Sequence, residues 1–149
     1  MTRRFWLIML ILAAVGVGFW LGWLEPRKRH QEFCQSVRAE LSTLAKKRPP
    51  GLTRRQWNNV VGWTIQGHSN SLVANWWIPR AEMDRFLTEL RERLRGPVTL
   101  STIDWIWNEF ERLAPDYGPT YSRNRRPTSP EKLREFEENG GTWLGIDAD

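Results

Sequence analysis

Apolar residues fill one long stretch near the start of the chain. From Phe5 to Leu24 there is no charged side chain. An α-helix of this length spans about 30 Å, the thickness of the hydrocarbon core of a bilayer. Tryptophans stand near both ends of the run, at Trp6, Trp20 and Trp23, where amphipathic rings favour the membrane interface. The pattern predicts one transmembrane helix, and Pro26 predicts a break directly after it.

A cleavable signal peptide would begin in the same way, with basic residues followed by an apolar stretch. The sequence Ala14-Val15-Gly16 resembles a cleavage site. However, the apolar run continues from Val17 to Leu24, which favours an anchor that is retained. A mature N-terminus near Val17 would decide for the signal peptide.

Small residues recur every fourth position within this apolar run. Ala14, Gly18 and Gly22 have this spacing. Small side chains at such intervals let two transmembrane helices approach closely. The same residues are also frequent in such helices by chance. The spacing marks a face through which a homodimer could form.

Beyond Pro26 the apolar residues follow a helical period. A narrow seam between residues 26 and 48 consists of Phe33, Val37, Leu41 and Leu44, and Pro49-Pro50-Gly51 predicts its end. Further helices are predicted over Thr53–Gly67, Pro79–Arg95, Ser101–Leu113 and Glu131–Glu138. Thr53 with Gln56 reads as a capping box, and Ser101 with Asp104 opens the later helix. The pattern between His68 and Ile78 fits either a helix end or a short extended piece.

These elements predict a mainly α protein, with one N-terminal transmembrane helix followed by a small bundle of about four to five helices. We divide the chain into an anchor with a short tail (1–25), a basic juxtamembrane helix (26–51) and a Trp-rich helical domain (52–149). Without the first 24 residues, 125 of the 149 remain, a size that can bury a hydrophobic core.

Basic charge gathers beside the anchor. Nine Lys and Arg stand against three Asp and Glu between residues 25 and 56, whereas residues 57–149 hold eleven against fourteen. A nucleic-acid-binding protein more often carries its basic excess on the folded domain. We therefore expect contact of Arg27, Lys28 and Arg29 with anionic lipid headgroups. The greater number of Lys and Arg after the span favours a cytoplasmic C-terminal domain, although Arg3 and Arg4 oppose this orientation.

Residues for metal or cofactor chemistry are scarce. The single cysteine, Cys34, excludes an internal disulfide. Together with His30 and His68 it makes only three potential ligands, which are too few and too scattered along the chain for a structural zinc site. No phosphate-binding glycine loop, dinucleotide motif or nucleophile elbow is present. We expect no metal and no cofactor.

His68 is the one weak catalytic candidate. It lies on the same helical stripe as Trp57, with Ser69 and Asn70 behind it. An exposed imidazole there could act as a general base. The sequence shows no Ser or Cys nucleophile with an orienting carboxylate near His68. The favoured interpretation is therefore a structural histidine at the edge of the core.

The candidate binding residues lie in two segments. Trp76 and Trp77 are adjacent, so one ring could fill the core while the other stays exposed to a protein partner or the lipid interface; both rings in the core is the plainer interpretation. The loop between the last two predicted helices carries an aromatic and basic group that fits phosphate, RNA or an acidic partner, or a solvated connector. Its members are Tyr117, Tyr121, Arg123, Arg125 and Arg126.

The leading functional hypothesis is a membrane-anchored interaction or scaffold module that meets a protein partner and is not an enzyme. A second hypothesis is a small membrane-bound enzyme that uses His68, which requires this histidine to be exposed in a cleft. A third is a structural protein of the cell envelope.

Overall fold

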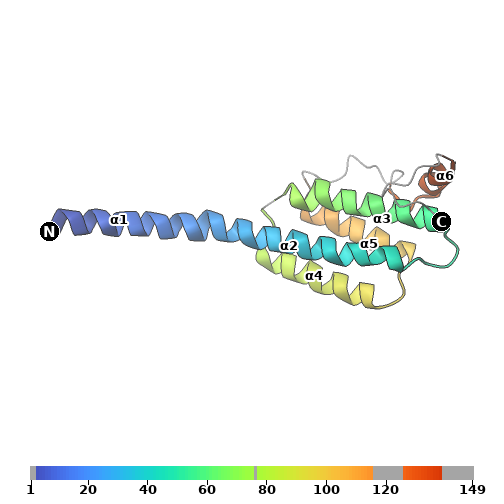
Figure 1. Cartoon of the computed structure of the whole chain (residues 1–149), viewed down its shortest axis with the longest axis horizontal. Coiled ribbons are helices and arrows are strands. Elements are labelled where there is room, and N and C mark those ends of the chain that lie inside the picture. The colour runs from blue at the N-terminus through green and yellow to red at the C-terminus, as the bar shows by residue number, and fades with distance from the viewer. Residues whose placement is uncertain (1–2, 76, 116–125, 139–149) are drawn as a thin grey trace.

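The computed structural model describes residues 3–75, 77–115 and 126–138. In these ranges the regular structure is entirely helical, which confirms the predicted fold class. The elements are α1 (Arg3–Phe19), η1 (Trp20–Leu24), α2 (Glu25–Ser42), η2 (Thr43–Lys46), α3 (Arg54–His68), η3 (Ser69–Val73), α4 (Arg80–Arg95), α5 (Leu100–Leu113) and α6 (Pro130–Glu138). Figure 1 shows a bundle at the end of a long helical stalk.

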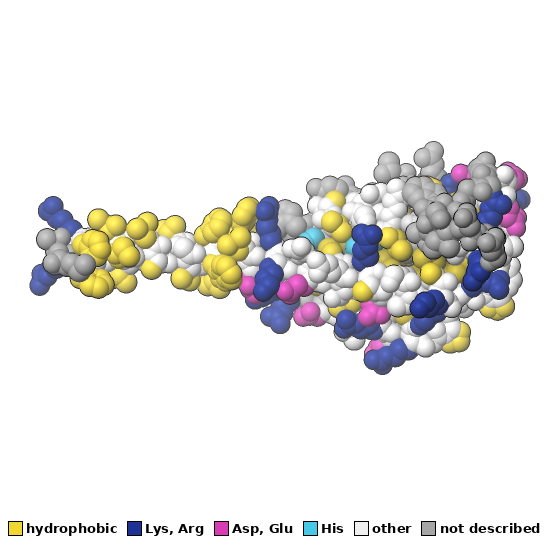
Figure 2. All heavy atoms as spheres, viewed as in Figure 1, with side chains coloured by type: hydrophobic (Ala, Val, Ile, Leu, Met, Phe, Trp, Pro, Cys, Tyr) yellow, Lys and Arg dark blue, Asp and Glu magenta, His cyan; other side chains and the backbone are white. Residues whose placement is uncertain are grey.

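The stalk is the first half of one uninterrupted helix from Arg3 to Lys46. In the described part of the chain, it is the one helix long and apolar enough, by length and composition, to cross a membrane. No side chain of α1 or η1 is buried, and Figure 2 shows apolar atoms along the stalk. The second half, α2, enters the bundle.

The predicted break at Pro26 is wrong. Pro26 is the second residue of α2 and lies inside the continuous helix, so its missing N–H removes one backbone hydrogen bond. The preceding turn, η1, is a π-helix in which the backbone N–H of Glu25 donates to the carbonyl of Trp20. A π turn is wider than an α turn, so it gives the proline ring room beside the carbonyl of Gly22. The helix can therefore continue through the proline.

The core is formed by the apolar seams that the sequence predicts. Helices α2, α3, α4 and α5 run alternately away from and towards the stalk, with α6 at the far end (Figure 1). The buried residues of the α2 seam are joined by Trp57, whose indole N–H donates to the Leu44 carbonyl over 2.6 Å. Phe86 stacks on the partly buried Trp105 with ring centroids 5.7 Å apart. Helix α2 thus belongs to the same hydrophobic core as the helices after it.

The helix ends agree with the sequence in part. The Thr53–Gln56 capping box is present, with both reciprocal hydrogen bonds. The helix predicted to open at Ser101 with Asp104 instead begins at Leu100, and Thr99 with Thr102 forms its cap. After His68 the helix does not become extended but closes with the π turn η3.

A carboxylate on α5 links two helices. Glu109 is buried and accepts hydrogen bonds from Arg85 of α4 at 2.6 Å and from Arg112 at 3.0 Å. Arg112 and Arg85 also bond to Glu82, and these hydrogen bonds hold the pKa of Glu82 below its usual value. The network fixes α4 against α5.

Candidate functional site

The end of the bundle nearest the stalk brings four elements together: the start of α2, η3, the start of α4 and the end of α5 (Figure 1). His30 Nε2 lies 2.8 Å from the carbonyl oxygen of Leu72. The Asn75 side-chain amide donates to the carbonyl of Leu113 over 2.9 Å. These contacts fix η3 and the following segment at the level where the stalk enters the bundle.

His68 lies inside this end of the bundle and is only 1% exposed. Neither ring nitrogen has a hydrogen-bond partner of normal geometry among the described residues. Burial, reinforced by the positive charge of Arg38, lowers the pKa of His68 to about 4, and the Cys34 backbone acts in the opposite direction. The ring lies 6.3 Å from that of Phe110. The exposed cleft that the enzyme hypothesis requires is therefore not met at this histidine.

The fold brings both histidines and the cysteine to one place, although they are scattered in the sequence. His30 and Cys34 share a face of α2, with Nε2 and Sγ 3.5 Å apart, and His68 faces them from α3. Burial raises the pKa of the Cys34 thiol to about 11. Among the described residues, no group of three His, Cys, Asp or Glu side chains is arranged to hold a metal ion. The cluster is a buried part of the core.

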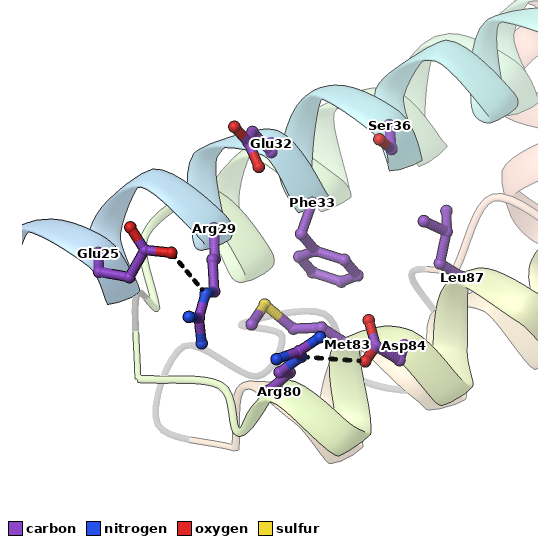
Figure 3. A pocket seen from close by; sticks show the side chains of 9 residues that line it. All are labelled: Glu25, Arg29, Glu32, Phe33, Ser36, Arg80, Met83, Asp84 and Leu87. Carbon is purple, nitrogen blue, oxygen red and sulfur yellow. Dashed lines mark hydrogen bonds and ion pairs between the residues drawn. The ribbon is translucent and has the colours of Figure 1, made fainter. Parts of the chain in front are cut away.

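A groove of about 380 Å³ opens between α2 and the start of α4 (Figure 3). Arg29 and Arg80 extend into it from the two helices, and Phe33 and Met83 lie beside them in the space between the helices. The full lining is Glu25, Arg29, Glu32, Phe33, Ser36, Arg80, Met83, Asp84 and Leu87. It combines an apolar floor with charges of both signs.

Each arginine of the groove is paired along its own helix. Arg29 Nε lies 3.0 Å from Glu25, and Arg80 Nε lies 3.5 Å from Asp84. These pairs at four-residue spacing were the only local signal in the sequence. The groove itself was missed, because it depends on α4 packing beside α2.

The predicted lipid-facing basic residues also have neighbours. The guanidinium of Arg27 lies over the Trp23 ring, 3.8 Å from its centroid. Lys28 Nζ lies 3.9 Å from Glu32, and Arg29 pairs with Glu25. Two carboxylates thus offset part of the positive charge that the triplet presents next to the apolar run.

The described member of the tryptophan pair is exposed. Trp77 is 68% exposed and Val73 is 50% exposed. All other exposed large apolar side chains of the described residues lie between residues 5 and 24. The interpretation that buries both rings is therefore wrong for Trp77, whereas Trp76 lies outside the described residues.

The other candidate residues are only partly placed. Arg126 is 8% exposed and donates to Glu111 of α5 over 2.6 Å, so this guanidinium serves an internal contact. Tyr117, Tyr121, Arg123 and Arg125 lie outside the described residues. The predicted dimer face stays a prediction: a β-carbon added at Gly18 or Gly22 would meet nothing within 4 Å.

No family model, curated protein or solved structure matches this chain. Its function has to be inferred from its own residues and their arrangement.

Proposed function

We propose that the chain is a single-pass membrane protein whose helical domain is a non-enzymatic interaction module held at the bilayer surface. One observation supports this most strongly: the helix that carries the apolar run continues without interruption from Arg3 to Lys46 and supplies core residues to the domain. A tether of this kind holds the domain at a fixed height and raises its local concentration at the membrane.

The same helix favours retention of the anchor over its removal as a signal peptide. Cleavage after Gly16 would leave Val17 to Leu24 on the domain as an exposed apolar stub. Such a stub would expose several large side chains to water at about 1.5–3 kcal/mol each. In a bilayer these side chains are solvated by lipid instead.

Trp77 is the residue we assign to a protein partner. Tryptophan is one of the residue types enriched at the energetically dominant positions of protein interfaces. Trp77 stands three residues before Arg80, which shares a groove with Glu25 at the edge of the apolar run. The partner therefore also reaches close to the bilayer, as another membrane protein or a second copy of this chain would.

The domain lies on the cytoplasmic side in this proposal. The Lys and Arg of the segment after Leu24 outnumber Arg3 and Arg4 before the span, and positive residues stay on the cytoplasmic side. A reporter enzyme fused after Asp149 tests the orientation, since activity confined to the cytoplasm is expected. Activity on the opposite side would reverse the assignment.

Photo-cross-linking tests the partner contact. A benzophenone amino acid is placed at position 77 of the full chain in its native membranes, and a control carries it at position 92 in place of Glu92, which is exposed in the distal half of α4. We expect a discrete protein adduct from position 77 and none from position 92. An adduct of twice the chain's mass identifies a second copy.

Two outcomes would contradict the assignment of Trp77. Adducts to lipid alone at position 77 would mean that this ring contacts the bilayer rather than a partner. Equal protein adducts from positions 77 and 92 would mean that the contacts are not specific to this end of the domain.

A further inference from the structure

The groove between α2 and α4 begins at the edge of the apolar run. Glu25, the first residue after Leu24, lines it together with Arg29 and Arg80. The helix rises about 7.5 Å from Leu24 to Arg29, and the headgroup layer on each side of a bilayer is about 5–7 Å thick. The proposed function requires Phe5–Leu24 to lie in the hydrocarbon core. The end of the groove beside Glu25 then lies among lipid headgroups.

The two arginines of the groove are suited to a phosphate. They extend from facing helices towards the same space (Figure 3). In their ion pairs both contribute Nε, which leaves the terminal guanidinium nitrogens as donors. Arginine favours phosphate because its planar group offers several N–H donors in a fixed geometry.

The carboxylates of the groove favour a ligand that also carries a positive charge. Glu25, Glu32 and Asp84 outnumber Arg29 and Arg80 in the lining. A ligand with only negative charge would face this acidic excess. A ligand with an ammonium group beside its phosphate matches both signs of the lining.

The floor of the groove is apolar. Phe33 and Met83 are almost fully buried and lie between the two helices, and Leu87 is partly buried and also lines the groove. The methylene groups that join an ammonium to a phosphate can pack on such a surface without loss of hydrogen bonds.

We propose that this groove binds the headgroup of a zwitterionic phospholipid of the ethanolamine type. The phosphate accepts hydrogen bonds from Arg29 and Arg80, and the ammonium donates to Glu25 and Asp84. The inference rests on the retained anchor of the proposed function, because the anchor sets the height of the groove. It differs from the sequence-based expectation of anionic headgroups.

Native mass spectrometry of the full chain tests the site. The protein is kept in detergent micelles with equal amounts of phosphatidylethanolamine and phosphatidylglycerol, and lipid adducts are counted. The wild type should retain phosphatidylethanolamine preferentially. The double variant Arg29→Gln/Arg80→Gln should bind it about a hundredfold more weakly, because the loss of each charged hydrogen bond implies a factor of about ten.

Arg91→Gln is the matched control. Arg91 of α4 pairs with Glu40 of α2 at 2.8 Å, so the variant removes an arginine between the same two helices but farther from the apolar run. It should retain the ethanolamine lipid as the wild type does. Thermal melts by circular dichroism should be similar for the wild type and the two arginine variants, because Arg29, Arg80 and Arg91 are exposed.

The converse variant Glu25→Gln/Asp84→Asn should shift the preference towards phosphatidylglycerol, since it removes the acidic excess. Equal retention of the two lipids by the wild type would overturn the proposal. So would ethanolamine lipid bound equally by the arginine double variant, or an adduct with soluble phosphoethanolamine but none with the lipid. If membranes yield the intact chain and these lipid results fail, the groove inference falls while the anchor stands.

Discussion

The indole of Trp107 on α5 fills the space that a side chain at position 67 of α3 would need. A β-carbon on Gly67 would lie 2.6 Å from Cη2 and 2.9 Å from Cζ2 of Trp107. Contacts this short require the ring or the helix to shift. The close approach of α3 and α5 beside His68 therefore depends on glycine at this position.

Gly67→Ala should lower the free energy of unfolding by about 1–3 kcal/mol, the usual cost of overpacking a core. In a helix without this contact, the same substitution would stabilise by up to about 1 kcal/mol. Denaturant titration of the full chain in micelles, followed by the helical circular dichroism signal, measures the difference. Gly96→Ala is the control, since nothing lies within 4 Å of its added β-carbon. An unchanged or raised stability of Gly67→Ala would contradict the packing described here.

The buried His68 should make stability depend on pH. Its pKa is about 4 in the fold against 6.5 for the ordinary side chain, so between these values the unfolded chain binds a proton that the folded chain does not. Stability is full above pH 6.5 and falls as the pH drops towards 4. From pH 7 to pH 5 the loss from this residue alone should be about 2 kcal/mol.

Comparison with His68→Leu isolates that effect from other titrating groups. The unfolding free energy is measured in micelles at pH 7 and pH 5 for both proteins, and the pH-dependent loss should be smaller in the variant by the amount above. The comparison uses the change in unfolding free energy between pH 7 and pH 5, so a difference in overall stability between the two proteins does not obscure it. Identical pH dependence in the two proteins would place His68 in a solvated setting and reopen its catalytic role.

Cys34 should be nearly inert in the folded protein. It is 7% exposed, and its raised pKa leaves about a hundredfold less thiolate than an ordinary cysteine. Alkylation by N-ethylmaleimide at pH 8 should therefore be at least about a hundredfold slower in the native state than in denaturant. Native labelling at the denatured rate would show that the thiol is open to acylation or intermolecular disulfide formation.

The helical pattern was legible in the sequence because it is local. The seam Phe33, Val37, Leu41 and Leu44 is buried throughout, since a four-residue spacing places side chains on one side of any helix. The continuation of the helix through Pro26 could not be predicted from the sequence, because it depends on a π turn that no residue type specifies. Local patterns therefore predicted the elements better than their junctions.

The candidate site depends on contacts between distant segments. Packing of α2 against α4 brings Arg29 and Arg80 to one groove. Packing of α2 against α3 brings His30 and Cys34 close to His68. The burial of His68 and the exposure of Trp77 also follow from this packing. Residue type alone does not decide them, because histidine and tryptophan occur both in protein cores and at protein surfaces. The sequence offered these residues as candidates but could not place them.

The continuous helix from the apolar run into the domain core supports the proposed anchor, and the mass of the protein recovered from the membrane fraction is the most direct test of it. Membranes washed at alkaline pH are dissolved in detergent, and the mass of the intact protein is measured by mass spectrometry. We predict that the protein stays with the membranes and has the full 17.6 kDa of the chain, with residues 1–24 present. A mature N-terminus near Val17, or recovery in the soluble fraction without detergent, would contradict the account.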